Sequence, residues 1–137
     1  MDKRKVFLLV YLGVGLGGVV GSLLRYFVSV STSNFLTNGF PVGTVIVNLA
    51  GSLFLGWFTS RIIGKNILNP VLSTSIATGL TGSFTTFSTF SMETIVYIED
   101  GRIGIAIFYV LVSAVGGLLL AAVGYRLGAV PFGEAGK

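Results

Sequence analysis

Long apolar runs separated by short polar or charged segments dominate this sequence. Val6–Leu24, Tyr26–Ser60, Asn66–Met92 and Ile103–Tyr125 contain no Asp, Glu, Lys or Arg, and a polar, proline-containing stretch near Ser31–Pro41 interrupts the second run. About 20 apolar residues cross the hydrocarbon core of a bilayer as a helix. The pattern therefore predicts an all-α integral membrane fold with four transmembrane helices, at about 6–28, 42–60, 70–97 and 103–126.

Composition supports the membrane assignment. Of the 137 residues, 53% are hydrophobic and 10% are charged, whereas a soluble domain carries about a quarter charged residues. The charges fall in short clusters between the apolar runs, which leaves no room for a separate soluble domain. We expect one transmembrane domain over residues 1–137, with a loose polar tail at 129–137.

Charge and the absent residue types exclude several functions. The chain has no Cys and no His, so disulfides, thiol chemistry and the usual neutral-pH proton shuttle are excluded. The cations are dispersed at the ends of the predicted spans, which does not indicate nucleic-acid binding. No pair of carboxylates within the spans could perform hydrolysis, so an enzyme is not expected.

The Lys and Arg residues also predict an orientation. With the N-terminus in the cytoplasm, seven cations lie on that side and two on the other, which satisfies the positive-inside rule. The seven are Lys3, Arg4, Lys5, Arg61, Lys65, Arg126 and Lys137, and the two are Arg25 and Arg102.

Glycines recur every four positions in the first and last spans, at Gly13, Gly17 and Gly21 and again at Gly124 and Gly128. Small residues at this spacing let two helices approach closely in lipid. These glycines therefore predict close helix contacts rather than a dinucleotide site, because no strand or acidic residue accompanies the overlapping G-x-G-x-x-G pattern.

The third span contains the most unusual stretch of the chain. Thr78–Ser91 combines eight hydroxyl residues, three Phe and two Gly, and would make a poor lipid-facing helix. Gly79 and Gly82 predict a break near the middle of this helix, with Ser and Thr side chains satisfying the released backbone groups. Such backbone is tolerated at membrane depth only when it is buried in protein or lines a watery cavity. Phe84, Phe87 and Phe90 would share one face of a helix, either as core packing or beside that cavity.

Three polar side chains within or near the spans each have two interpretations. Asn48, in the second span, either ties two helices together or has a functional role, because a carboxamide in hydrocarbon must find partners. Glu93 is the acid expected inside the membrane, and it is either functional or a structural hydrogen-bond acceptor. Arg25 either has a function at the end of the first span or extends its side chain to the membrane surface.

These residues together resemble the Fluc (CrcB) family of bacterial fluoride channels. The matching motifs are Gly21-Ser-Leu-Leu-Arg25-Tyr, Gly43-Thr44-x-x-x-Asn48-x-x-Gly51, Gly79-x-x-Gly82-x-x-Thr85-Thr-Phe87-Ser-Thr-Phe90-Ser-x-Glu93 and Tyr109-x-x-x-Ser113. The resemblance extends over nearly the whole chain.

The resemblance implies a multi-pass protein of the bacterial inner membrane that exports fluoride passively. It implies an antiparallel, dual-topology homodimer with two pores along its interface. A central structural sodium ion would be held by the backbone carbonyls of Gly82 and Thr85 of both subunits. The pore residues that it implies are Asn48, Phe87, Phe90, Thr89, Tyr109, Ser113, Glu93 and Arg25.

Three alternatives stay open from the residues alone. A heterodimer with an inverted homologue would agree with the one-sided charge count better than a homodimer. A small proton-coupled multidrug exporter has the same size and span count, although the first span lacks the carboxylate that it would need. An assembly subunit of a membrane complex would explain the glycine spacing but not the hydroxyl-rich stretch.

Overall fold

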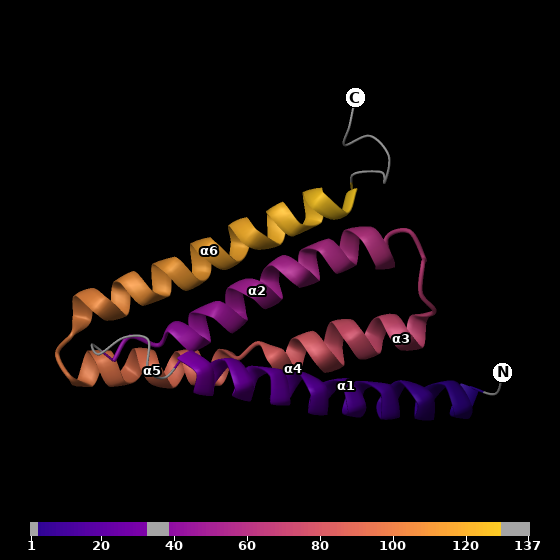
Figure 1. The fold of residues 1–137 in the computed structure, drawn as a ribbon, viewed down its shortest axis with the longest axis horizontal. Coiled ribbons are helices and arrows are strands. Elements are labelled where there is room, and N and C mark those ends of the chain that lie inside the picture. The colour runs from indigo at the N-terminus through magenta and orange to yellow at the C-terminus, as the bar shows by residue number, and fades with distance from the viewer. Residues whose placement is uncertain (1–2, 33–38, 130–137) are drawn as a thin grey trace.

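A computed structural model describes residues 3–32 and 39–129 of the chain, and every regular element in these ranges is a helix (Figure 1). The first pass is α1 (Lys3–Thr32), and the second is α2 (Val42–Phe58), which continues as the π-helical segment η1 (Thr59–Ile63). The third pass is divided into α3 (Pro70–Thr74), the π-helical η2 (Ser75–Thr81), α4 (Gly82–Phe84) and α5 (Phe87–Glu99). The last pass is α6 (Ile103–Ala129).

Three of these passes are long and apolar enough to cross a membrane, namely Lys3–Thr32, Val42–Ile63 and Ile103–Ala129. The expectation of a multi-pass, all-helical membrane protein is confirmed. The third pass is broken, as expected, so that none of its pieces reaches a spanning length, and its membrane crossing remains a proposal. The predicted tail lies outside the described residues from position 130 onward.

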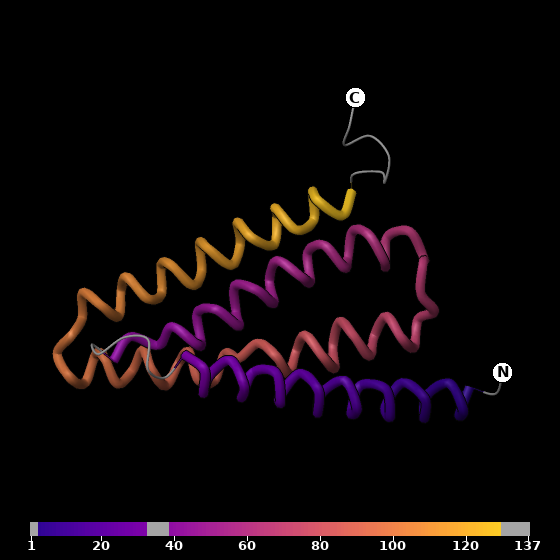
Figure 2. The backbone as a smooth tube through the Cα atoms, in the orientation of Figure 1, coloured from indigo at the N-terminus to yellow at the C-terminus, as the bar shows by residue number. Residues whose placement is uncertain are grey.

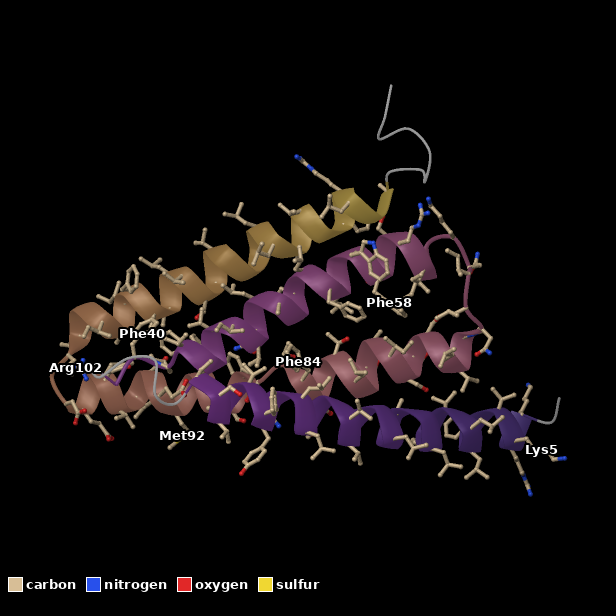
Figure 3. All side chains as sticks on the ribbon, viewed as in Figure 1. Lys5, Phe40, Phe58, Phe84, Met92 and Arg102 are labelled. Atoms are coloured by element: carbon tan, nitrogen blue, oxygen red, sulfur yellow. The ribbon has the colours of Figure 1, made fainter. Side chains whose placement is uncertain are left out.

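Successive passes run in opposite directions (Figure 2), so the start of α1, the end of η1, the start of α3 and the end of α6 lie at one end of the bundle. We call this the basic end, because Lys3, Lys5 and Lys65 lie there with Arg4, Arg61 and Arg126. Figure 3 labels Lys5 at this end and Arg102 at the opposite end. Glu99 and Asp100 precede Arg102, so the opposite end carries mixed charge. Lys137 lies outside the described residues.

Local signals explain where the third and last passes begin. The Asn69 side chain accepts a hydrogen bond of 2.9 Å from the Leu72 N–H, and Pro70 occupies the first helical position of α3. Both are favourable at a helix N-terminus, where backbone N–H groups lack helical partners. The turn between α5 and α6 passes through Gly101 at φ 72°, a conformation that other residues rarely adopt.

The predicted glycine contacts of α1 are confirmed. A Cβ built on Gly17 would lie 2.5 Å from the Ser75 carbonyl oxygen, and one on Gly21 would overlap the Leu80 carbonyl. On the facing segment, a Cβ on Gly79 would lie 2.5 Å from the Val14 carbonyl oxygen. The backbones of α1 and the η2–α4 segment are therefore in direct contact along this interface.

The contact between α2 and α6 is built in the same way. A Cβ on Gly124 would overlap the Leu53 carbonyl, and one on Gly128 would lie 2.7 Å from the Trp57 carbonyl oxygen. Gly56 of α2 makes the reciprocal contact with the Ala121 carbonyl. These two close helix pairs, α1 with η2 and α2 with α6, form the rigid part of the bundle.

A small aromatic core occupies the end opposite the basic end. Tyr97, Ala106 and Tyr109 are buried there, and Phe40 and Phe90 pack against them. The Tyr97 hydroxyl donates a 2.7 Å hydrogen bond to the Gly39 carbonyl, which fixes the start of α2 beside α5. This core holds α5 and α6 in place next to the break in the third pass.

Candidate functional site: a polar cavity at the break in the third pass

The third pass leaves the helical conformation at two threonines. Thr85 has φ −77° and ψ 161°, and Thr86 has φ −147° and ψ 124°, so both are extended. The break was expected near Gly79 and Gly82, but Gly82 is helical at φ −64° and ψ −31°. Gly79 instead serves helix packing against α1, whereas the β-branched threonines suit an extended backbone. Figure 1 shows this non-helical stretch between α4 and α5.

Asn48 of α2 is hydrogen-bonded to the backbone of the break. Its Nδ2 donates to the Thr86 carbonyl at 2.9 Å, and its Oδ1 accepts from the Thr86 N–H at 2.8 Å. An extended residue inside a bundle has no helical partners, and an unpaired buried backbone group costs about 1–3 kcal/mol. One side-chain amide thus satisfies both backbone groups of Thr86, and Asn48 does connect two helices.

The hydroxyl residues complete this arrangement, as the sequence predicted. The Thr86 Oγ1 accepts a 3.2 Å hydrogen bond from the Thr89 N–H and caps α5, while it donates to the Thr89 Oγ1 at 3.0 Å. The Thr85 Oγ1 and N–H both donate to the Thr81 carbonyl, each at 3.0 Å. Side chains thus replace the helical hydrogen bonds that the break removes.

Two backbone carbonyls lose their usual partners as a result. In an α-helix the carbonyl of a residue accepts from the N–H four residues later. For Gly82 that donor is Thr86, whose N–H is bound to Asn48, and for Thr85 it is Thr89, whose N–H is bound to the Thr86 hydroxyl. The Gly82 and Thr85 carbonyl oxygens are therefore left to interact with something other than their own helix.

A cavity of about 420 Å³ borders the break. Its walls come from α2, the third pass and α6, and it is open on one side of the chain. Of the predicted site residues, the cavity is lined by Asn48, Gly82, Thr85, Phe87, Phe90 and Ser113. The Ser113 Oγ is buried and has no hydrogen-bond partner within residues 3–32 and 39–129.

Glu93 lies beside this cavity and accepts two hydrogen bonds. The Thr44 hydroxyl donates to Oε1 at 2.9 Å, and the Tyr109 hydroxyl donates to Oε2 at 2.6 Å. Tyr109 is 0% exposed, so this network is internal to the bundle. Glu93 thereby connects α2, α5 and α6. Sequence analysis assigned no role to Thr44, although its position four residues before Asn48 puts both on one face of α2.

The two phenylalanines of the cavity differ in burial. Phe87 is 80% exposed, whereas Phe90 is half-buried with its ring centroid 5.0 Å from that of Tyr109. Their own ring centroids lie 6.0 Å apart at 42°, so they share a face of α5. Phe84 does not share this face, because it belongs to α4 on the other side of the break.

Four predicted site residues lie outside the lining of this cavity within one chain, namely Glu93, Tyr109, Thr89 and Arg25. Thr89 is exposed on α5 and is hydrogen-bonded to Thr86. Arg25 is half-buried on α1, one turn beyond the contact of Gly21 with α4.

Together, the fold and this site define a class of protein: a small multi-pass membrane protein whose polar cavity borders a broken helix. Residues 12–125 match the protein family described as CrcB-like protein, Camphor Resistance (CrcB). The chain belongs to this family, and the resemblance found from the sequence motifs is confirmed.

Individual relatives agree with this assignment. "Fluoride-specific ion channel FluC 1" of Bacillus cereus is 43% identical over 125 residues, which are 91% of this chain and 87% of that protein. A protein of the same name from Desulfitobacterium hafniense is 47% identical over 107 residues, covering 78% and 92% of the two chains. "Fluoride-specific ion channel FluC 2" of Geobacillus kaustophilus is 42% identical over 117 residues, covering 85% and 91%. These relatives are named as channels and not as enzymes, in agreement with the expectation from the sequence.

Proposed function

We propose that the chain is a subunit of a fluoride-selective channel, through which fluoride leaves the cytoplasm passively down its gradient. The names of its relatives support the choice of ion. The observation that carries the proposal is the buried, unpartnered Ser113 hydroxyl on a cavity beside the break. A hydroxyl left without an internal acceptor is available to donate to an ion in that cavity.

Fluoride is small, strongly hydrated and a strong hydrogen-bond acceptor, so a pore must replace its water with donors. Ser113 supplies one donor. Asn48 supplies a second, because one of its two amide hydrogens is bound to Thr86 and the other remains. The edges of the Phe87 and Phe90 rings carry partial positive charge and extend this path. Weak neutral sites in series allow the ion to leave, whereas a ring of cations would retain it.

Glu93 and Tyr109 shape the wall of the pore in this proposal. The Tyr109 hydroxyl donates to Glu93 and not toward the cavity, so its part is to hold the carboxylate in place. Thr89 and Arg25, which lie outside the cavity lining, are assigned to the mouth. There Arg25 would raise the local concentration of anions.

The proposed structural sodium ion fits the donor set. Sodium is a hard cation that prefers oxygen ligands, as calcium does, and the Gly82 and Thr85 carbonyls have both lost their helical donors to Asn48 and Thr86. Within residues 3–32 and 39–129 there is no group of three or more His, Cys, Asp or Glu that could hold a metal. A bound sodium ion would supply positive charge to these carbonyl dipoles and would link two subunits at their breaks.

A partner subunit is part of the proposal, because Phe87 is 80% exposed and the cavity is open on one side. We propose that the partner is an inverted copy of the chain. The alternative is an inverted homologue, which the gathering of cations at the basic end favours because it predicts a single orientation for this chain. Ile67→Cys and Ile98→Cys test this, since the two positions are 54% and 52% exposed near opposite ends of the bundle. Labelling of each variant from both faces of intact cells supports the homodimer, and labelling of each from one face supports the heterodimer.

A proton-coupled multidrug exporter is the competing function. Such a protein needs a titratable carboxylate deep in its first span, and α1 contains no Asp or Glu. Glu93 lies in the third pass, where it accepts hydrogen bonds from two hydroxyls, and it is not part of the cavity lining.

Efflux from liposomes separates these functions. Purified protein should release fluoride without a proton gradient and should release chloride much more slowly. An exporter would require the proton gradient, and an assembly subunit would release neither ion. Equal release of the two anions would contradict the fluoride assignment.

A further inference from the structure

A second cavity, of about 590 Å³, lies at the basic end, where the connection after η1 meets α3. Its polar lining residues are Asn66, Asn69, Ser73, Thr74 and Thr78. Ala77 lines both this cavity and the one beside the break, so the two cavities border one residue in common. Of these residues, only Thr78 belongs to the hydroxyl-rich stretch that indicated a cavity.

The hydroxyls of this cavity differ from three others in the third pass. The Ser75, Thr81 and Thr85 hydroxyls each donate to a carbonyl of their own pass at 2.7–3.0 Å. Within residues 3–32 and 39–129, the Ser73, Thr74 and Thr78 hydroxyls form no hydrogen bond. Ser73 is only 8% exposed, and it lines the cavity with an unpartnered hydroxyl.

The charge around the cavity favours an anion. Lys65 precedes the connection that forms one wall, and the other cations of the basic end lie at the same end of the bundle. The acids at described positions, Glu93, Glu99 and Asp100, lie at or toward the opposite end. The Asn69 side-chain oxygen Oδ1 accepts a hydrogen bond from the Leu72 N–H, which leaves the amide hydrogens of that side chain as donors.

From these observations we propose that this second cavity is a binding site for small, strongly hydrated anions, which pass from it to the cavity at the break beside Ala77. The inference rests on the proposed channel function for its ligand, fluoride. Ser73, Thr74 and Thr78 donate to the partly dehydrated ion, and the cations of the basic end raise its local concentration. The site assigns a function to the basic end beyond orientation in the membrane.

Thiol accessibility tests the cavity without reference to ion flux, because the chain has no Cys. Thr74→Cys should react with water-soluble thiol reagents, and roughly tenfold faster with an anionic than with a cationic reagent of equal size. The preference should shrink in high salt, which screens the field. Ser75→Cys is the matched control, because that side chain faces Gly13 of α1 and should not react. An unreactive Thr74→Cys, or faster reaction with the cationic reagent, would overturn the proposal.

Fluoride efflux tests the donors themselves. Ser73→Ala removes one buried hydroxyl and should reduce efflux roughly fivefold, the effect expected from one neutral hydrogen bond. Ser75→Ala makes the same chemical change on the other side of the helix and should leave efflux unchanged. Both variants should elute as wild type does on size exclusion.

The two experiments separate failure of this inference from failure of the channel assignment. If wild-type protein releases no fluoride but Thr74→Cys keeps its preference for the anionic reagent, the proposed function fails and the anion cavity stands. If wild-type protein releases fluoride while Ser73→Ala is unchanged and the reagent preference is absent, the channel stands and the second cavity is not part of its path.

Discussion

The two sides of the third pass meet their neighbours in opposite ways. Toward α1, backbone lies against backbone through Gly17, Gly21 and Gly79, and the Ser75 hydroxyl is bound to its own helix. Toward α2 and α6, side chains make the contacts: Asn48 binds the break, and the Glu93 network is internal. That side also leaves a cavity with an unpartnered hydroxyl.

The side of the third pass that faces α1 therefore holds the structure together, and the side that faces α2 and α6 provides the candidate site. The close glycine contacts leave no polar group for a ligand. The opposite side holds polar side chains at fixed positions, and some of their hydrogen-bond donors remain unused. A site held by packed and hydrogen-bonded neighbours is better defined than one on a mobile loop. Substitutions on the side that faces α1 should therefore impair folding, whereas substitutions on the side that faces α2 and α6 should impair transport.

The largest effect is expected from Gly21→Leu. Its side chain would overlap the Leu80 carbonyl, a backbone atom that cannot turn aside. We expect a loss of at least about 3 kcal/mol, the upper end for overpacking, and little folded protein by size exclusion. Gly15→Leu is the control, because no atom lies within 4 Å of a Cβ there. Normal yield of Gly21→Leu would contradict the close contact of α1 with the third pass.

Asn48→Asp should affect both folding and transport. A carboxylate keeps the acceptor for the Thr86 N–H but replaces the donor to the Thr86 carbonyl with a negative charge. We expect a stability loss of about 1–3 kcal/mol and a fall in fluoride efflux of roughly a hundredfold or more, because the charge repels an anion at short range. Ser52→Ala removes a neutral hydroxyl from the same cavity, one that already donates to the Asn48 carbonyl, and should retain most of the flux. Wild-type flux from Asn48→Asp would place this residue away from the ion path.

Phe87→Leu and Phe90→Leu should separate stability from flux. Phe90 packs on Tyr109, so its replacement should lower the stability of the fold by about 1 kcal/mol. Phe87 is 80% exposed, so its replacement should change the stability of one subunit very little. Both variants should reduce fluoride efflux strongly, because Leu lacks an aromatic edge. Unchanged efflux in both would assign these rings to packing alone.

Sequence reasoning recovered the all-helical membrane fold and the glycine contacts, because hydropathy and four-residue spacing report directly on lipid exposure and helix approach. It also selected Asn48 and Glu93, since polar groups inside apolar runs are costly and therefore informative, whereas Ser113 was implied only by the resemblance to the Fluc family. The position of the break was harder to predict from the sequence. Gly79 and Gly82 are the expected helix breakers, but α1 needs Gly79 for packing, and the backbone opens at Thr85 and Thr86 where Asn48 can satisfy it.

Pairing across helices was also beyond the sequence. No spacing rule places Glu93 against both Thr44 and Tyr109, because these contacts depend on how α2, α5 and α6 pack. The second cavity was missed because no motif assigned a role to Asn69, Ser73 or Thr74, although hydroxyls at positions 73, 74 and 78 were visible in the sequence.

The smallest effect on stability is expected from Ser113→Ala. Removing a buried hydroxyl that has no partner should leave stability unchanged or raise it by about 1 kcal/mol. Fluoride efflux should nevertheless fall several-fold, because a donor to the ion is lost. Thermal unfolding in detergent and efflux from the same preparation check the two effects, and a loss of stability without loss of flux would contradict the proposed role.

The most direct measurement of the central claim is the current through a planar bilayer that contains the purified chain, with a fluoride gradient across it and equal chloride on both sides. A selective, passive fluoride pathway predicts that the current reverses at the equilibrium potential for fluoride and does not respond to an added pH gradient. A reversal potential near zero, or a current that requires the pH gradient, would contradict the account.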